Sequence, residues 1–144
     1  MSTVNISKKH PAVYQQVVGL SAAAEEAAAA AGLDKKLVEL VKIRVSQING
    51  CAFCLRMHTR DALELGESTD RLAVVAAWWE SQYFSKAEQA ALMLAEDVTR
   101  LSVPGRTVDT SALTDDQVSA VNWIVIVMNA WNRVAIRSGY PVAP

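Results

Sequence analysis

Apolar residues recur along the chain at spacings of three and four positions, which is the period of an α-helix that buries one face. The clearest stripe consists of Leu37, Val41, Val45 and Ile48. No segment keeps the strict alternation of apolar and polar residues that predicts a half-buried strand. The pattern therefore predicts an all-α protein.

Residues that cap helices divide this pattern into about six predicted helices. Capping boxes mark the starts of the last two, at Ser85 with Glu88 and at Thr114 with Gln117. The predicted helices run from 12 to 31, from Asp34 to Asn49, from Cys51 to Gly66, from Ser68 or Thr69 onward, from Ser85 to Arg100, and from Thr114 to Ser138. The longest predicted loop covers residues 102–112. In the helix after Ser68 we expect an inner face formed by Leu72, Val75, Ala76 and Trp79.

Composition and charge exclude several classes of protein. The length of 144 residues suits one domain, 1–144, and a hydrophobic content of 51% excludes a disordered chain. A net charge of −1 without a basic face argues against nucleic-acid binding. No apolar run approaches the roughly 18 residues of a membrane span, and the N-terminus lacks the apolar core of a signal peptide, so we expect a cytoplasmic protein. The mean hydropathy of +0.15 predicts a buried interface in a homo-oligomer.

The two cysteines, Cys51 and Cys54, lie in one Cys-Ala-Phe-Cys motif. In a reducing compartment such a pair is more often redox-active or metal-binding than a structural disulfide. Both lie at a predicted helix N-terminus, where the helix dipole lowers the pKa of a thiol. At this spacing one thiol can capture the other, once oxidised, as a disulfide. The motif therefore indicates redox chemistry.

His58 lies seven positions after Cys51, so a helix places it on the same face as both cysteines. Ala62 and Leu65 continue this face, which predicts that it points into the protein. A buried imidazole needs a hydrogen-bond partner, and Glu39 on the preceding helix is the nearest acidic candidate. Such a carboxylate would fix the tautomer of His58 and stabilise its protonated form.

Other interpretations of these residues stay open. One is a zinc site formed by Glu39, Cys51, Cys54 and His58, although the chain has no second Cys/His pair. Considered alone, His58 could be a buried core residue whose hydrogen bonds are satisfied. Considered alone, Glu39 could be a surface residue that forms an ion pair with Lys35 or Lys42. Haem attachment is excluded because no histidine directly follows the second cysteine. A thioredoxin-like domain is excluded because no strands are predicted.

The segment from Glu39 to His58 strongly resembles the AhpD-like alkylhydroperoxidases of the carboxymuconolactone decarboxylase superfamily. The family pattern is glutamate, eleven residues, Cys-x-x-Cys, three residues and histidine, and it is complete here as Glu39, Cys51, Cys54 and His58. The sequence S-Q-I-N-G-C-A-F-C-L-R-M-H and the later N-A-W-N-R at Asn129–Arg133 resemble the short single-domain branch. The resemblance spans nearly the whole chain and implies an AhpD-like helical domain.

The resemblance implies a thiol-dependent peroxidase that reduces organic hydroperoxides, or hydrogen peroxide, with no cofactor and no metal. It implies that Cys54 attacks the peroxide and becomes a sulfenic acid, which Cys51 resolves as a disulfide, and that His58 and Glu39 form a proton relay. From the residues alone the nucleophile stays open, because the helix dipole favours Cys51 while proximity to His58 favours Cys54. The decarboxylase branch lacks the cysteine pair, so lactone decarboxylation is not implied.

One position departs from the family. The best-characterised AhpD proteins have a histidine between the two cysteines, where this chain has Phe53, whose ring can neither relay a proton nor add positive charge. The thiol reductant is therefore open between a lipoyl-type, a thioredoxin-like and a low-molecular-weight thiol. Family members form trimers or hexamers. The large aromatic residues would suit such an interface or a pocket wall, but we expect most of them in the core: Trp78, Trp79, Tyr83, Phe84, Trp123 and Trp131.

Two further functions would use the same residues. One is a dithiol–disulfide oxidoreductase whose oxidant is a protein disulfide or a small disulfide. The other is a redox sensor, or a zinc-stabilised oligomer, without significant turnover. The relative rates at which peroxide and disulfide oxidise the reduced cysteine pair distinguish the two enzymes, and metal analysis tests the zinc version.

Overall fold

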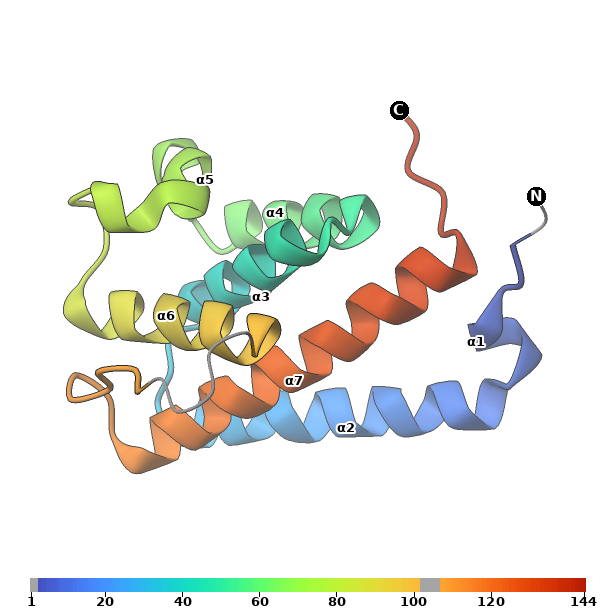
Figure 1. Cartoon of the computed structure of the whole chain (residues 1–144), viewed down its shortest axis with the longest axis horizontal. Helices are drawn as coiled ribbons and strands as arrows, with labels where there is room; N and C mark the ends of the chain where they lie inside the picture. The colour runs from blue at the N-terminus through green and yellow to red at the C-terminus, as the bar shows by residue number, and fades with distance from the viewer. Residues whose placement is uncertain (1–2, 102–106) are drawn as a thin grey trace.

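The computed structural model describes residues 3–101 and 107–144, which form seven α-helices and one 3-10 helix and contain no strand. The 3-10 helix is η1 (Val75–Glu80). The α-helices are α1 (Ile6–Lys9), α2 (Pro11–Ala30), α3 (Lys35–Asn49), α4 (Ala52–Glu64), α5 (Thr69–Val74), α6 (Lys86–Arg100) and α7 (Asp115–Ser138) (Figure 1). The prediction of an all-α fold is confirmed.

The sequence did not predict α1, a single turn that the side chain of Asn5 caps by accepting a hydrogen bond from the Lys8 N–H. Of the predicted loop at 102–112, residues 102–106 lie outside the described residues, and residues 107–112 contain no helix. None of the helices described has the length and the apolar content needed to cross a membrane.

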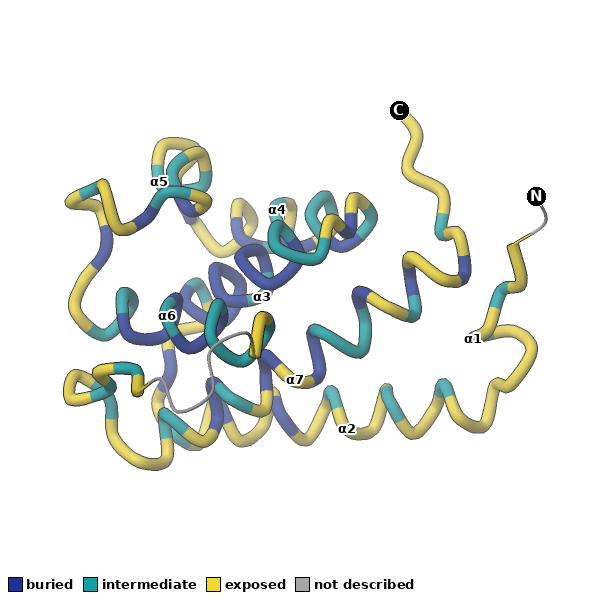
Figure 2. Tube along the Cα trace, viewed as in Figure 1, coloured by how far each residue is buried: buried dark blue, intermediate teal, exposed yellow. Residues whose placement is uncertain are grey.

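Helix α3 occupies the centre of the bundle, with α4, α6 and α7 packed against it, and it is buried along most of its length (Figure 2). It begins after Asp34, whose side chain accepts a hydrogen bond of 2.7 Å from the Lys36 N–H. It ends at Gly50, whose φ of 69° lies in the left-handed region that glycine adopts without strain. This sharp end lets the chain continue directly into α4, which packs alongside α3.

The apolar core has two parts on different sides of α3. The larger part lies among α2, α3, α6 and α7 and includes Val41, Val45 and both cysteines. The smaller part lies among α3, α4, η1 and α6 and includes Leu40, Ile43 and Trp78. One helix can supply both parts because successive side chains are turned by about 100° around the helix axis.

The predicted inner face of residues 69–80 is wrong at two positions. Val75 is buried as predicted, but Ala76 is exposed and Trp79 is 61% exposed. The inward position belongs to Trp78, which is 7% exposed. The helix tightens to a 3-10 helix at Val75 and leaves helical geometry at Ala77, so the buried side chains follow a spacing of three residues.

The N-terminal and C-terminal segments lie close together near the end of α7 (Figure 1). The Ile6 N–H donates a hydrogen bond of 3.2 Å to the hydroxyl of Ser138. The hydroxyls of Ser7 and Tyr140 are 2.6 Å apart and share a hydrogen bond. These contacts hold Tyr140 in place, and its ring forms part of the cavity described below.

Candidate active site

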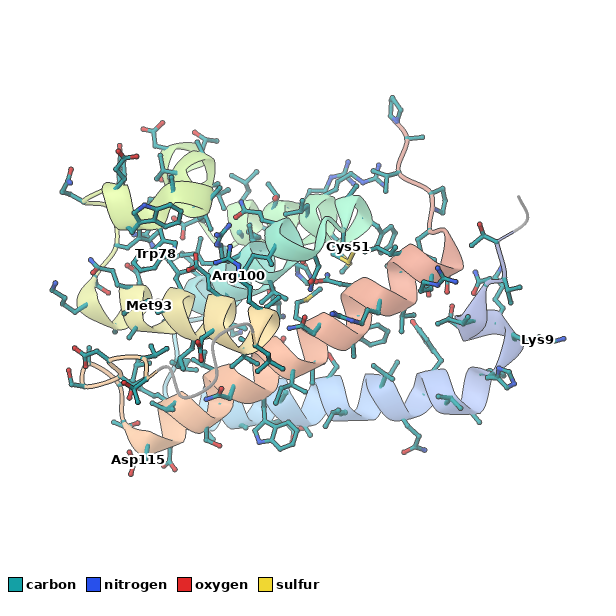
Figure 3. All side chains as sticks on the ribbon, in the orientation of Figure 1. Lys9, Cys51, Trp78, Met93, Arg100 and Asp115 are labelled. Carbon is teal, nitrogen blue, oxygen red and sulfur yellow. A yellow bond between two sulfur atoms is a disulfide. The ribbon has the colours of Figure 1, made fainter. Side chains whose placement is uncertain are left out.

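The two cysteines lie at the start of α4 and form a disulfide (Figure 3). Cys51 is the N-cap residue of the helix, and its sulfur accepts a hydrogen bond of 3.3 Å from the Cys54 N–H. The side chains are almost completely buried, since Cys51 is 1% and Cys54 is 2% exposed. The helix N-terminus therefore directs the Cys54 N–H toward the sulfur of Cys51, an environment that stabilises a thiolate.

The turn that precedes Cys51 is attached to α7 by a chain of amides. The amide of Asn49 donates hydrogen bonds of 2.9 Å to the side-chain oxygens of Asn129 and Asn132. Asn132, which is fully buried, in turn donates a hydrogen bond of 3.0 Å to the hydroxyl of Ser46. The N-A-W-N-R sequence, quoted above only for its resemblance, thus anchors the end of α3 and holds the cysteine turn against α7.

His58 lies on α4 one turn beyond Cys54, and its Nδ1 is 2.8 Å from Oε2 of Glu39 on α3. Both side chains are about nine-tenths buried. An ionised carboxylate only accepts hydrogen bonds, so Nδ1 of the neutral imidazole carries the proton and Nε2 is left unprotonated. The predicted continuation of this face holds at Ala62, which is fully buried, but fails at Leu65, which is 41% exposed because α4 ends at Glu64.

Glu39 also contacts Lys42, whose Nζ is 3.0 Å from its Oε1. Burial raises the pKa of Glu39, but the hydrogen bond from His58 and the charge of Lys42 outweigh burial, so this pKa lies below its ordinary value. The two partnerships considered for Glu39 from the sequence, with His58 and with Lys42, therefore exist together. The carboxylate stays ionised because both neighbours favour its charge.

A fourth member of this network is Glu25 on α2, which forms an ion pair with Lys42. Burial lowers the pKa of Lys42, but the charges of Glu39 and Glu25 outweigh burial, so this pKa lies above its ordinary value. No signal in the sequence points to Glu25, which is 17 residues from Lys42 and belongs to no motif. Only the packing of α2 beside the site brings it there.

A cavity of about 360 Å³ opens beside this network. Cys54 and His58 line it, together with Glu25, Lys42 and Ser21, and these five residues form its polar part. The remaining lining is mainly apolar and includes two edge-to-face aromatic pairs, Phe53 with Tyr140 at 5.0 Å and Tyr14 with Trp131 at 5.4 Å between ring centres. Its volume and apolar walls are typical of a site for a small organic molecule.

The aromatic residues are less buried than the sequence predicted. Trp78 and Phe84 belong to the core as expected, whereas Trp79, Tyr83 and Trp123 are each about half exposed or more. Trp131 is partly buried and lines the cavity. No sequence pattern distinguishes these cases, because all six residues lie within helical patterns or beside them.

The zinc interpretation would use both cysteines as thiolates, and this structure holds them in the disulfide form. The two sulfur atoms are bonded to each other, so neither is a thiolate ligand. Among the residues that the structure describes, the group with suitable spacing for a metal is Glu39, His58 and Asp61. Its central carboxylate already holds the ammonium group of Lys42. The four residues that the sequence singled out are brought together, but as a disulfide beside a histidine–glutamate pair.

The fold and the site together define a helical protein in which a Cys-x-x-Cys pair and a buried histidine–glutamate pair meet at an apolar cavity. Residues 11–97 match the carboxymuconolactone decarboxylase family, and the chain belongs to this family. The matched residues include the cysteine motif, His58 and Glu39, and they end in α6, before the part of the cavity wall that α7 supplies.

Two curated relatives share part of this sequence. The chain is 42% identical over 106 residues to the uncharacterized protein YdfG of Bacillus subtilis (strain 168), a match that covers 70% of this chain and 72% of YdfG. It is 37% identical over 82 residues to the uncharacterized protein YnjA of Escherichia coli (strain K12), which covers 57% of this chain and 43% of YnjA.

A solved structure matches almost the whole chain. The crystal structure of ATU0492 from Agrobacterium tumefaciens, a protein of unknown function described as a candidate AhpD antioxidant defence protein, superimposes with a TM-score of 0.84. The sequences are 27% identical, and the match covers 99% of this chain and 100% of that one. The expectation of an AhpD-like fold is therefore confirmed.

Proposed function

We propose that this protein is a thiol peroxidase that reduces organic hydroperoxides to alcohols, with Cys54 as the nucleophile. The observation that carries this proposal is the meeting of three features at one cavity: a cysteine of a Cys-x-x-Cys disulfide, a histidine that a buried carboxylate orients, and apolar walls. A nucleophile, a base with its orienting group and a space for the substrate are the components that covalent catalysis needs.

In the first step, Nε2 of His58 accepts the proton of the Cys54 thiol. The thiolate attacks the terminal oxygen of the hydroperoxide, so an S–O bond forms, the O–O bond breaks, and the departing alkoxide takes the proton from His58. In the second step, the thiol of Cys51 attacks the sulfenic acid, which forms the disulfide and releases water. Two electrons pass from the thiol pair to the peroxide, and an external thiol restores both thiols.

The geometry supports Cys54 rather than Cys51 as the residue that meets the peroxide. Both cysteines belong to the core, but Cys54 also lines the cavity together with His58, whereas Cys51 caps the helix and does not line the cavity. The helix dipole and the Cys54 N–H, which donates to the sulfur of Cys51, instead favour Cys51. We give access to the cavity the greater weight, because a peroxide has to reach the sulfur atom that it oxidises.

The same burial bears on the alternative function and on the reductant. A protein disulfide would have to bring a sulfur atom to Cys54, whose residue is only 2% exposed. A small peroxide, or a slender thiol such as a low-molecular-weight thiol or a lipoyl-type arm, can enter through the cavity. These considerations favour the peroxidase over an oxidoreductase that acts on protein disulfides, and a slender reductant over a thioredoxin-like domain.

One stopped-flow experiment tests the proposal. Fully reduced protein is mixed with equimolar cumene hydroperoxide or, separately, with a low-molecular-weight disulfide, while tryptophan fluorescence reports on Trp131 beside the site. Mass spectrometry then quantifies the Cys51–Cys54 disulfide against the peroxide consumed. We expect rapid, stoichiometric oxidation by the hydroperoxide. Slow oxidation by the hydroperoxide with faster oxidation by the disulfide would overturn the proposal in favour of the dithiol–disulfide oxidoreductase.

A further inference from the structure

In the polar part of the cavity and directly behind it, carboxylates outnumber ammonium groups. Apart from Cys54 and two tyrosines, the ionisable side chains among the described residues that line it are Glu25, Lys42 and His58. The ammonium group of Lys42 is bound on one side by Glu25 and on the other by Glu39, which lies directly behind it. Two carboxylates thus surround one ammonium group, and the carboxylate of Asp61 lies 3.7 Å from His58.

Among the described residues that line this cavity, an anionic group finds no cationic side chain without a carboxylate partner. Lys42 is already engaged by two carboxylates, and no arginine belongs to the lining among the described residues. The other walls are aromatic and aliphatic, so they cannot replace the water that a carboxylate loses when it is buried. An uncharged group loses much less hydration free energy when it is buried in the same cavity.

We propose that the cavity selects uncharged organic hydroperoxides against those that carry a carboxylate, and that Glu25 determines this specificity. The inference rests on the proposed peroxidase function and adds the substrate class to it. Glu25 supplies the outer of the two negative charges. Without it, Lys42 is paired only with Glu39, and its remaining hydrogen-bond capacity is open to a substrate carboxylate.

Glu25 can be changed without disturbing the catalytic pair. Its side chain is 45% exposed, it belongs to α2, and its ion-pair partner is Lys42, so the hydrogen bond between His58 and Glu39 does not involve it. The next residue, Glu26, provides a matched control: it lies on the same helix, is also exposed, and does not line this cavity. Glu25→Gln and Glu26→Gln change the net charge of the protein equally.

The test uses three probes of similar size: cumene hydroperoxide, its para-carboxylate and its para-carboxamide. The second-order rate constant for oxidation of the reduced protein is measured by stopped flow in a single turnover, so the reductant plays no part. We expect the carboxylate to react about tenfold more slowly than the carboxamide, which is the size of a one-charge effect at the separations within such a cavity. Glu25→Gln should remove most of this difference, and Glu26→Gln should leave it unchanged.

The outcomes separate the two proposals. Equal rates for the carboxylate and the carboxamide in the unmodified protein would overturn the charge selection while leaving the peroxidase intact. An equal effect of Glu25→Gln and Glu26→Gln would show that net charge, and not the cavity, discriminates, and would overturn the role of Glu25. Failure of all three probes to oxidise the protein would overturn the peroxidase itself and this inference with it.

Discussion

Helix α3 carries two buried charge networks that look alike by burial but differ in what surrounds them. On one side, Glu39 pairs with His58 and Lys42. On the other, Arg44 donates a hydrogen bond of 2.9 Å from its Nε to Glu96, which also accepts one of 2.9 Å from the indole N–H of Trp78. Figure 3 shows that Cys51, which lies beside the first network, and Trp78, which belongs to the second, are well apart.

We call the second network the closed network because it does not border the cavity. The side chains of Arg44 and Glu96 are buried to about the same extent as those of Glu39 and His58. However, neither Arg44 nor Glu96 lines the cavity that Cys54 lines. Each buried polar side-chain atom in the described residues has a hydrogen-bond partner, so an unsatisfied group does not distinguish the two networks either. The difference lies in the neighbouring thiol and in the empty space. Buried charge alone therefore does not identify a functional site, because folds also use it to join helices.

Substitution of the cysteines should have the largest effect on the chemistry of the first network. Cys54→Ser should abolish hydroperoxide consumption, because no thiolate then faces the cavity. Cys51→Ser should still react once but leave a sulfenic acid on Cys54, since the resolving thiol is missing. Trapping with dimedone followed by mass spectrometry identifies the oxidised residue. Trapping on Cys51 in the Cys54→Ser variant, with none in the other variant, would reverse the assigned roles.

His58→Ala should lower the rate constant for oxidation by about 10²- to 10⁴-fold, the usual contribution of a general acid–base group. It should also raise the pH at which the reactive thiol ionises, because the imidazole partner is lost. Ultraviolet absorbance of the thiolate measures that titration. Gln47→Ala, which removes a side chain hydrogen-bonded to Arg44 in the closed network, serves as the control. An unchanged titration in His58→Ala would make His58 a core residue only.

Glu96→Ala should give the opposite result: a loss of stability without a loss of chemistry. Removing the carboxylate leaves the guanidinium of Arg44 buried without its ion-pair partner, which costs about 3–5 kcal/mol in the free energy of unfolding. Urea denaturation measures this loss, and the oxidation rate constant of the folded variant should stay the same. A parallel fall in the rate constant would mean that the two networks are coupled through α3.

The smallest expected effect is on the pH dependence of stability. The pKa of Glu39 in the folded protein lies below the ordinary value of 4.5, so folding favours its ionised form. The stability that this provides is fully present above pH 4.5 and is lost as the pH falls through the lower, folded value. The stability difference between the unmodified protein and Glu39→Gln should therefore shrink on going from about pH 7 to about pH 3. Urea denaturation across this range checks it, and a constant difference would contradict it.

Several features of the site could be predicted from the sequence because they depend on neighbours within a few residues. The offset from Cys54 to His58 places both on one face of a helix, and α4 is that helix, with Cys51 as its N-cap residue. Residues that cap helices, such as Asp34 and Ser85, marked helix starts to within a residue. These interactions are local, so the sequence contains them whatever the rest of the fold does.

Features that depend on how helices pack could not be obtained in this way. Trp78 and Trp79 are adjacent and chemically identical, but Trp78 is buried and Trp79 is exposed. The change from an α-helix to a 3-10 helix at Val75 determines which of the two is buried. In the sequence, nothing distinguishes Glu25 from other polar residues of an alanine-rich helix. Its role depends on the packing of α2 beside Lys42. The cavity likewise exists only where α2, α3, α4 and α7 leave space between them.

The sequence by itself therefore determined the helical class, most helix starts and the common face of Cys54 and His58 on α4, because periodicity and capping act over one or two turns. The tertiary structure alone decided which cysteine lines the cavity, which carboxylates surround Lys42 and what shape the cavity has. Those properties arise from contacts between distant segments, whose positions are set by the packing of whole helices and not by any short pattern of residues.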